Sequence, residues 1–541
     1  MTIRSHLARM ALVPWFQPAL VRSLRAGYGK DDFLADLAAG LLVGVVALPL
    51  SMGLAIASGV GPEQGLYTAI IGGLLVALLG GSRVQVAGPA GAFVGICAAA
   101  VIGHGYLGLA LATLMAGFFL LGFGALRLGK YIGYIPYPVV IGFTTGIALI
   151  IASTQLDTAL GIADPSPAIP DFIGRCRHVL MGLGELKTGC LAISAGTLAV
   201  IVLLRKVSLK IPGALIAVLL GTAIVAFLGL SDVAVPTIGS KFKEISATFR
   251  LTDWQATLPD RSAWLTKAWE VLPLALGIAL LVGIESLLCA VVADGMSGDR
   301  HDSDTELVAQ GCANIASACF MGLPVTGVIA RTSTNARAGA RSPVSSLLHA
   351  LTVLAILLVL APLVKLIPLA SLAGVLLSVC WYMAELPLWP RLFRSGGSDV
   401  FLLVLACVIT VFVDLIWAVG LGVVAAFVFL LVRKSAHPEK EEPETIDVEE
   451  RADEVRLALS GHLHFGRAAE PRAVEARLRR GTLHLTLDFS HALFIDCSYA
   501  QALRELAVQA RKQGVTVRAV GLQGRAATDF GRFGLREAIL L

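Results

Sequence analysis

Long apolar segments are the feature that most constrains how this chain folds. A helix that crosses a bilayer needs about 20 apolar residues, and segments of roughly that length recur through most of the sequence. Two further segments, 88–103 and 326–338, are apolar or small but too short or too interrupted to span alone. We therefore expect a polytopic α-helical membrane protein with fourteen transmembrane elements. The candidates for complete spans are residues 38–57, 63–80, 106–125, 131–151, 190–204, 212–230, 268–293, 305–321, 343–362, 366–385, 399–415 and 417–433.

Charged residues divide the chain into two kinds of domain. They make up 15% of the 541 residues, whereas soluble domains contain about 25%. The stretch from Ala436 onward has roughly 29% charged residues, and the part before it has roughly 11%. We expect an N-terminal arm at 1–30, a membrane domain at 31–435, an acidic linker at 436–454 and a small cytoplasmic domain at 455–541. The basic residues form no continuous stripe, so the net charge of +5 indicates no nucleic-acid partner. The nine cysteines lack metal-ligand spacing, and we expect no metal and no cofactor.

Basic residues in short loops orient the spans. Cytoplasmic loops carry an excess of lysine and arginine, and every second short connection of this chain does so. We therefore expect a multi-pass protein of the cell (inner) membrane with both termini in the cytoplasm. After those of the N-terminal arm, the basic residues concerned are Arg83, Arg127, Lys130, Arg205, Lys206, Lys210, Arg300, Arg337, Arg341, Arg391, Arg394, Arg433 and Lys434.

The two interrupted segments occupy matching places in an internal repeat, because they are the third and the tenth of fourteen elements. Pro49, central in the first element, precedes Glu285, central in the eighth, by 236 residues, and Gly88 precedes Gly327 by 239. Seven is odd, so the two halves of a seven-plus-seven repeat are inverted. Interrupted helices at matching positions of such transporters indicate a binding site at the membrane midplane. The alternative is that both are ordinary kinks in spanning helices, which tolerate glycine and proline.

The residues at these interruptions favour an anion as the ligand. Pro89 suits the first turn of a helix, where its missing N–H costs nothing, and Thr326 is a candidate N-cap for the tenth element. Two helices that enter from opposite faces would bring their free backbone N–H groups together. Such helix N-termini bind anions.

Two charged residues lie deep within the predicted elements. A charge such as Glu285 or Arg331 at the bilayer centre costs about 2.5–3.5 kcal/mol on insertion scales, so each should face a cavity or a partner. A carboxyl group shielded from water takes up a proton more readily, which suits Glu285 to proton coupling. Arg331 stays charged and offers two parallel donors to an oxyanion. The alternative is an ion pair between the two that simply joins the halves of the repeat.

These motifs resemble those of the sulfate permease (SulP) family, which includes the animal anion exchangers and prestin. The stretches that carry the resemblance are residues 47–67, 80–93, 284–288, 292–301 and 326–335. The resemblance implies a seven-plus-seven inverted repeat with core and gate domains, an anion site between the third and tenth elements, an elevator-like movement and a homodimer. Members of the family move sulfate, bicarbonate, chloride, oxalate or dicarboxylates.

The resemblance also implies which residues form the site. Sodium-dependent bicarbonate members carry Asp in place of Glu285 and Thr in place of Cys289, a difference that favours proton coupling here. Many bacterial members carry Thr in place of Ala90, so one hydroxyl is missing and strongly hydrated anions such as sulfate are less favoured. Glu285 is the implied proton-coupling residue. The implied substrate-binding residues are Leu50, Leu54, Gly88, Pro89, Ala90, Gly91, Ala92, Phe93, Thr326, Gly327, Val328 and Arg331.

The charged tail follows an α/β pattern. Alternation at 455–459 and 483–489 predicts half-buried strands, with a third strand near 515–521 and helices near 468–480 and 499–513. This pattern resembles the STAS domain attached to most SulP transporters. Stand-alone STAS domains are phosphorylated on a serine where this chain has Cys497, so that form of regulation is not expected, and Ser498 is a candidate cap for the following helix. A structural or dimerising role is the simpler interpretation of the tail.

Together these features predict a secondary active transporter of small anions of the sulfate, bicarbonate or dicarboxylate class, working by proton symport or anion exchange. Its expected partners are the anion, protons, the lipid bilayer and a second copy of the chain. No catalytic constellation indicates an enzyme. Two alternatives stay open: a nucleobase–proton symporter of the same architecture, against which Arg331 and the STAS-like tail argue, and a membrane sensor that signals through that tail.

Overall fold

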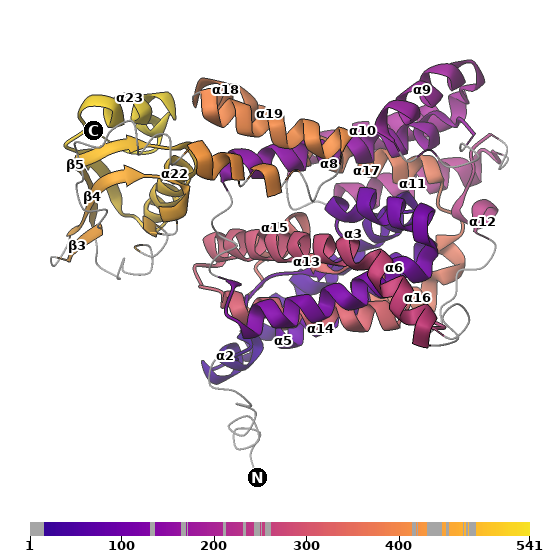
Figure 1. The fold of residues 1–541 in the computed structure, drawn as a ribbon. Helices are drawn as coiled ribbons and strands as arrows, with labels where there is room; N and C mark the ends of the chain where they lie inside the picture. The colour runs from indigo at the N-terminus through magenta and orange to yellow at the C-terminus, as the bar shows by residue number, and fades with distance from the viewer. Residues whose placement is uncertain are drawn as a thin grey trace, which may run out of the picture. The chain divides into compact units, whose positions relative to one another are not determined.

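A computed structural model gives the fold of the chain (Figure 1). It divides into two compact units, one of Met1–Ile132 with Ile147–Tyr382 and one of Gly133–Gly146 with Met383–Leu541. The predicted segments 131–151, 399–415, 417–433 and 468–480 and the linker 436–454 lie partly outside the described residues, as does the start of the N-terminal arm. The structure describes residues 16–129, 136–163, 169, 171–208, 212–230, 234–242, 249, 251–254, 261–395, 397–413, 418, 420–422, 424–429, 446–450, 454–468, 470–471, 474 and 483–540.

Helices make up almost all of the first unit. Seven helical segments in the described part of the chain are long and apolar enough to cross a membrane, and four shorter apolar helices accompany them. The fourteen-element count stays a prediction. In chain order the helices are α2 (Ala19–Arg25), α3 (Lys30–Ala57), α4 (Pro62–Tyr67), η2 (Thr68–Gly72), α5 (Gly73–Leu79), η3 (Gly91–Phe93), α6 (Val94–Ala125), α8 (Tyr137–Leu160, which runs through both units), α9 (Phe172–Gly182), η4 (Leu183–Glu185), α10 (Thr188–Val207), α11 (Gly213–Phe227), α12 (Ile238–Lys241), α13 (Arg261–Ser297), α14 (Ser303–Cys319), α15 (Ile329–Arg337), α16 (Val344–Val364) and α17 (Leu369–Met383).

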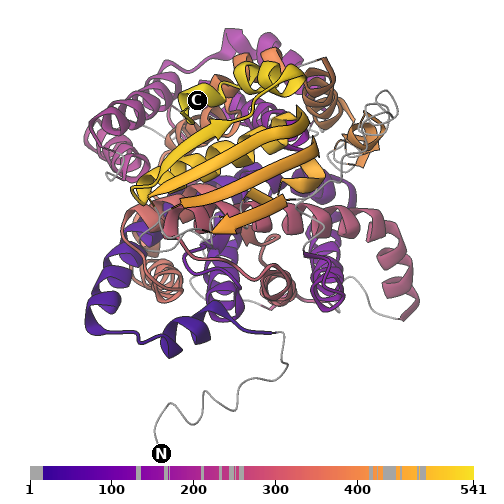
Figure 2. The ribbon, with the colours of Figure 1, turned by 90° about the vertical axis from the view of Figure 1, so that its left-hand side faces the viewer.

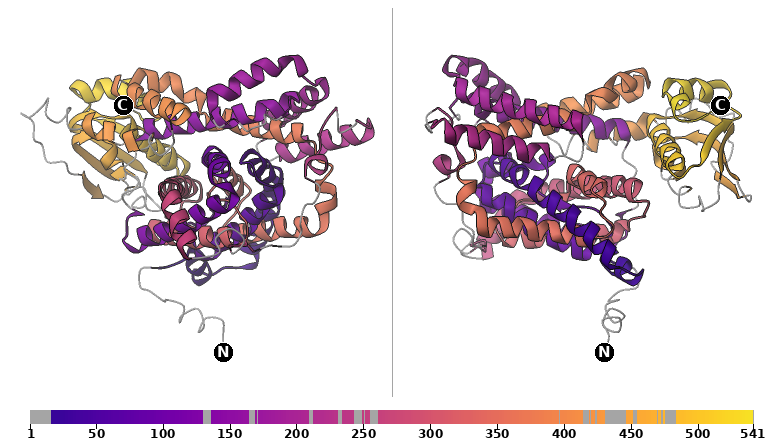
Figure 3. Two further views of the ribbon diagram at one scale, coloured as in Figure 1. Left: turned by 45° about the vertical axis from the view of Figure 1, so that its right-hand side comes forward. Right: turned by 180° about the vertical axis from the view of Figure 1, so that it is seen from behind.

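Close helix packing holds this unit together. Helix α6 packs against both α13 and α14, and α3 packs against α16 (Figure 1 and Figure 3). Glycines allow the approach: a Cβ on Gly124 of α6 would lie 2.9 Å from the carbonyl oxygen of Asp304, and one on Gly44 of α3 would lie 3.0 Å from that of His349. Small residues serve this purpose in membrane helices, where apolar contact with lipid competes with contact between helices.

A sharp break separates the third predicted element from the fourth. Within α6 the backbone leaves the helical conformation at Gly105, whose φ is 69°. That conformation is strained for residues with a side chain and open to glycine. The break falls between the predicted segments 88–103 and 106–125, and thus confirms that boundary.

The second unit contains a four-stranded sheet. In the order β3 (Ile446–Glu450), β4 (Glu454–Leu463), β5 (His484–Ile495) and β6 (Thr516–Val520), β3 is antiparallel to β4 and the remaining neighbours are parallel (Figure 2). The predicted strands are confirmed. Strand β3 lies in the stretch predicted as linker, where its charged residues hide the alternation. The unit's helices are η5 (Leu386–Leu388), α18 (Trp389–Ser395), α19 (Gly397–Phe412), η6 (Phe465–Arg467), α22 (Cys497–Lys512), α23 (Gly524–Arg532) and η7 (Leu535–Glu537).

Alternation along the strands builds the core of this sheet. Leu457 and Leu459 of β4 are buried, as are Leu487 and Phe489 of β5, and they pack with the fully buried Tyr499 of α22. Burying each large apolar side chain contributes about 1.5–3 kcal/mol. The helix predicted at 499–513 is therefore stabilised by the burial of its apolar face against the strands.

Candidate functional site

The two interrupted segments meet in the first unit. Strand β1 (Ala87–Gly88) pairs antiparallel with β2 (Thr326–Gly327), Ala87 opposite Gly327 and Gly88 opposite Thr326. The N–H of Val328 extends this pairing by donating to the carbonyl oxygen of Val86 at 2.9 Å. Both strands are buried. The segments are thus extended and paired with each other, not kinks in continuous helices.

A helix begins after two intervening residues that follow β1 and after one that follows β2. Helix η3 starts at Gly91 and α15 at Ile329, and neither first turn receives a side-chain cap. The first N–H groups of a helix lack partners within it, so two such ends lie beside the pairing. The expectation that Thr326 caps the tenth element is wrong: Thr326 belongs to β2, and its hydroxyl donates to the carbonyl oxygen of Val282 at 3.2 Å. The extended pairing places that hydroxyl against α13 instead of the helix end.

Arg331 lies in the first turn of α15 and is only 2% exposed. Its Nη2 donates to the hydroxyl oxygen of Ser51 on α3 at 2.9 Å. In the described part of the chain, its Nε and Nη1 have no hydrogen-bond acceptor. A Cβ on Gly88 would lie 2.5 Å from Nη1, and the φ of Gly88 is 157°. The absence of a side chain at Gly88 therefore lets the guanidinium lie against β1.

Glu285 lies on α13, half-buried, and no salt bridge joins it to Arg331. The interpretation of the two as an ion pair is therefore wrong. Three neighbours on α13 contact the interrupted segments or the chain just before them. The carbonyl oxygen of Val282 accepts from Thr326, and the hydroxyl of Ser286 accepts from the side-chain amide of Gln85 at 2.9 Å. The thiol of Cys289 donates to the hydroxyl of Thr332 at 3.1 Å. Residues three and four apart share a helix face, so Glu285 lies on the face that borders the pairing.

A fully buried carboxylate on α14, that of Glu306, was not found from the sequence. Glu306 on α14 is fully buried, and its Oε1 accepts hydrogen bonds from Gln85 at 2.8 Å, Ser286 at 2.9 Å and Gln310 at 2.8 Å. Its Oε2 accepts from the N–H of Gly81 at 2.9 Å. This network joins α13, α14 and the chain that leads into β1.

The polar spacing along α14 is the signal that could have found Glu306. Glu306, Gln310 and Asn314 follow one another at four-residue intervals in a helix and so line one face. Asn314 binds both backbone groups of Val325, accepting from its N–H at 2.9 Å and donating to its carbonyl oxygen at 2.8 Å. The face therefore positions the chain just before β2. Glu306 is the second residue of the predicted span 305–321 and was not among the predicted site residues.

The remaining predicted site residues lie on α3 and in the chain next to β1 and β2. On α3, Leu50 is half-buried and Leu54 is buried, one residue before and three residues after Ser51. Their contact with substrate stays a prediction. Between β1 and α6, Pro89, Ala90, Ala92 and Phe93 are buried and Gly91 is half-buried, while Val328, just after β2, is half-buried.

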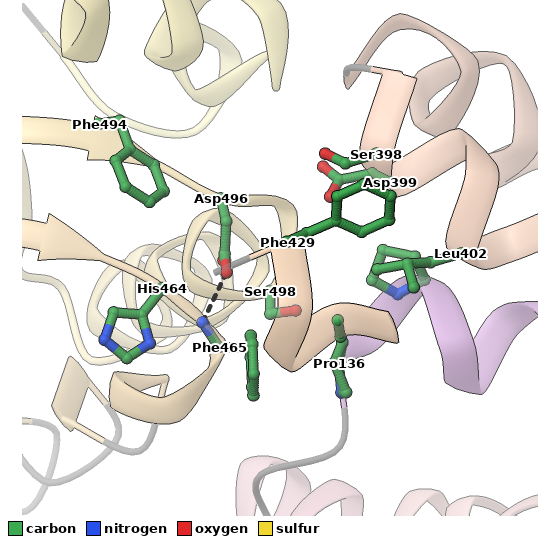
Figure 4. A pocket seen from close by; sticks show the side chains of 12 residues that line it. Pro136, Ser398, Asp399, Leu402, Phe429, His464, Phe465, Phe494, Asp496 and Ser498 are labelled. Atoms are coloured by element: carbon green, nitrogen blue, oxygen red, sulfur yellow. Dashed lines mark hydrogen bonds between the residues drawn. The ribbon is translucent and has the colours of Figure 1, made fainter. Parts of the chain in front are cut away.

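The turn before α22 holds a separate polar cluster in the second unit. Asp496 is the N-cap of α22: Oδ1 accepts from the N–H of Tyr499 at 2.8 Å, and Oδ2 accepts from the N–H of Phe465 at 2.6 Å (Figure 4). The expectation that Ser498 caps this helix is therefore wrong. The carboxylate takes the cap because it lies one residue before the helix, and the hydroxyl of Ser498 accepts from the N–H of Tyr137 instead, at 2.9 Å. Burial raises the pKa of the Cys497 thiol well above its usual range, and the carboxylates of Asp399 and Asp496 raise it further.

Comparisons with known proteins agree with this architecture. Residues 33–406 match the model of the sulfate permease family, and residues 445–541 match that of the STAS domain. A putative sulfate transporter, YvdB, of Bacillus subtilis is 38% identical over 519 residues, which cover 95% of this chain and 96% of that protein. The bicarbonate transporter BicA of Picosynechococcus sp. is 33% identical over 441 residues, 79% of this chain and 74% of that protein.

Solved structures show the same fold. The transmembrane domain of a cyanobacterial bicarbonate transporter BicA matches with a TM-score of 0.62 at 30% identity, covering 73% of this chain and 99% of that one. The structure of SLC26A9 matches with a TM-score of 0.69 at 18% identity, covering 99% of this chain and 91% of that one. The predicted fold class, a multi-pass helical membrane protein with a C-terminal STAS domain, is confirmed, and the relatives are transporters, not enzymes. The chain belongs to the sulfate permease family.

Proposed function

We propose that this protein is a secondary active transporter of small anions and that its substrate binds where β1 and β2 pair, beside Arg331. The observation that carries the proposal is the buried guanidinium, 2% exposed, with two of its three nitrogens lacking an acceptor among the described residues. An isolated charge in so dry a place is costly. An anion would supply both the missing charge and the missing acceptors.

The shape of the site suits a small, compact anion. Arg331 supplies parallel N–H donors for an oxyanion, and the uncapped first turns of η3 and α15 supply backbone N–H groups with partial positive charge. The names of the relatives indicate sulfate and bicarbonate as the first candidates. With Ala90 at the site, one possible hydroxyl ligand is absent, which favours bicarbonate or a carboxylate over sulfate.

Proton coupling through Glu285 is part of the same proposal. Glu285 lies on the α13 face that borders the pairing and has no salt bridge to Arg331. Binding one monovalent anion beside a protonated Glu285 leaves the net charge of the region the same as without the anion and with an ionised Glu285. Electrostatic cost therefore favours loading an anion and a proton together. The proposal also includes an elevator-like movement and a homodimer, as the family resemblance implies. It places the protein in the cell membrane with both termini in the cytoplasm, as the basic loops imply.

A nucleobase symporter is the less favoured alternative. A neutral nucleobase would leave the charge of Arg331 without a counterion, whereas an anion would not. The sensor alternative requires that no anion crosses the membrane.

Uptake into liposomes that contain the purified protein tests the proposal. Labelled sulfate, bicarbonate, fumarate and uracil are offered with and without an inward proton gradient. We expect uptake of at least one anion, faster with the gradient, and none of uracil. Uptake of uracil alone would support the nucleobase symporter, and uptake of none of the four would support the sensor.

A further inference from the structure

Helix α16 carries a buried histidine that the proposed transport mechanism leaves unused. His349 is fully buried, and no described residue donates a hydrogen bond to either nitrogen of its ring. The backbone carbonyl of Val43 on α3 attracts one ring N–H. Buried polar atoms without a partner are rare in native structures, and each calls for an explanation. His349 is therefore a candidate for contact with a ligand.

The face of α16 that carries His349 borders the paired strands. Ser346 lies three residues before it and donates to the carbonyl oxygen of Gln85 at 2.6 Å, in the chain that leads into β1. Ser345 lies four residues before it and accepts a hydrogen bond from Nδ2 of Asn335 on α15 at 2.8 Å. Residues three and four apart share a helix face, so His349 lies on the face that contacts both segments of the site.

The ring itself lies close to β1 and to Arg331. A Cβ on Gly73 of α5 would lie 3.9 Å from Cδ2 of His349 and 3.6 Å from the carbonyl oxygen of Ala87. The ring and the backbone of β1 therefore flank the same point on α5. The positive charge of Arg331 acts on the ring, although no hydrogen bond joins the two side chains. A ring acceptor and the unpartnered N–H groups of Arg331 thus lie in one buried region.

The imidazole of His349 is neutral in this setting. A second positive charge beside the buried guanidinium would lack a counterion and would therefore be costly. A neutral imidazole has one nitrogen that donates and one that accepts, and the carbonyl of Val43 faces the donor. The remaining nitrogen is an acceptor only. A ligand between this nitrogen and Arg331 has to accept hydrogen bonds from the guanidinium and donate one to the ring.

We propose that His349 selects anions that carry a hydrogen, of which bicarbonate is the simplest, over anions that carry none, such as sulfate and nitrate. The inference rests on the proposed function and narrows its substrate class. The two oxygens of bicarbonate without a hydrogen would accept from Arg331, and its O–H would donate to the acceptor nitrogen of His349. A site built to bind a hydroxyl rejects an analogue that lacks it, because the polar group of the site is then left unpaired.

Titration of the purified protein with bicarbonate and with nitrate, at a slightly alkaline pH, tests this selection. Nitrate has the planar shape and the single charge of bicarbonate but no hydrogen. We expect the wild type to bind bicarbonate about three- to tenfold more tightly than nitrate, the effect of one hydrogen bond. In His349→Leu the two affinities should become similar, through weaker binding of bicarbonate alone. The ratio of the two affinities is the readout, because a general loss of packing would weaken the binding of both anions.

Thr352→Val is the matched control, since Thr352 lies three residues after His349 on α16 and its hydroxyl donates within the helix, to the carbonyl oxygen of Leu348. The inference is overturned if His349→Leu keeps the wild-type ratio or if Thr352→Val loses it as well. A wild type that binds nitrate as tightly as bicarbonate also overturns it, and that result needs no variant to fold. Anion transport would stand in each of these cases. A wild type that moves no anion into liposomes would overturn the proposed function too.

Discussion

Nη2 of Arg331 donates a hydrogen bond to Ser51 Oγ at 2.9 Å, and this contact joins residues 280 positions apart in the chain. Ser51 is the only described acceptor for a guanidinium that is almost completely buried. A neutral hydroxyl satisfies one donor and supplies no countercharge. A bound anion would supply that countercharge and the acceptors that Nε and Nη1 lack among the described residues.

Arg331→Gln should abolish or strongly weaken anion binding. Hydrogen bonds to charged groups contribute about 1.5–3 kcal/mol each, so the loss of a single one weakens affinity about 10- to 150-fold and the loss of two weakens it further. Titration of the purified protein with the transported anion measures this. Arg337→Gln, at an exposed position of the same helix, is the control. Unchanged affinity in Arg331→Gln would show that the arginine is structural.

Ser51→Ala should make the protein more dependent on its ligand. The variant removes the acceptor that Arg331 uses in the empty site, at a cost of about 1.5–3 kcal/mol, whereas a bound anion would still satisfy the guanidinium. We expect a lower melting temperature without anion and a larger rise on adding it than in the wild type. An equal rise in both proteins would mean that the anion does not replace Ser51.

Glu285→Gln should separate anion transport from the proton gradient. The amide cannot take up or release a proton, so uptake in liposomes should no longer respond to an imposed pH difference. Downhill movement or exchange of the anion should persist, because Glu285 makes no salt bridge with Arg331. If the variant kept full proton-driven uptake, another group would carry the proton.

Glu306→Gln should destabilise the fold instead of uncoupling transport. Its carboxylate accepts from Gln85, Ser286, Gln310 and the N–H of Gly81, and an amide nitrogen in its place would face those donors. A buried group left unsatisfied costs about 1–3 kcal/mol. Thermal unfolding in detergent measures the loss, with Glu63→Gln, a half-buried glutamate of α4, as the comparison. A wild-type melting temperature would show that the network tolerates the amide.

The STAS domain should lose stability in acid through Asp488. Burial raises the pKa of this carboxyl, but hydrogen bonds from Ser490 and the ion pair with Arg456, 2.6 Å away, outweigh that effect, so the pKa lies below its usual range. A depressed pKa stabilises the fold above the unfolded value of about 3.9 and ceases to do so as the pH falls through the folded value. Circular dichroism of the purified protein between neutral and acid pH checks this. In Asp488→Asn the unfolding of the STAS domain should depend less on pH than in the wild type. Equal pH dependence in the two proteins would show that Asp488 is not the group responsible.

Much of the fold follows from local features of the sequence. Apolar segments of sufficient length insert in the membrane because unsatisfied backbone groups are costly there, so the helices and the strands of the tail could be placed from periodicity. Gly88 and Gly327, at matching offsets, identified the two segments that pair. Glu285 and Arg331 stood out because charges are expensive in an apolar run.

Contacts between distant residues could not be obtained in that way. Whether Arg331 bonds to Glu285 or to Ser51 depends on how α3, α13 and α15 pack, over separations of 46 and 280 residues. The same holds for Glu306, whose partners come from three different segments, and for Ser498, whose hydroxyl accepts from the N–H of Tyr137, 361 positions away in the chain. The sequence by itself determined which segments are buried in lipid and where charge is retained, because those are properties of each segment. Only the tertiary structure decided which groups satisfy those charges and which donors stay free, because that depends on distances set by packing.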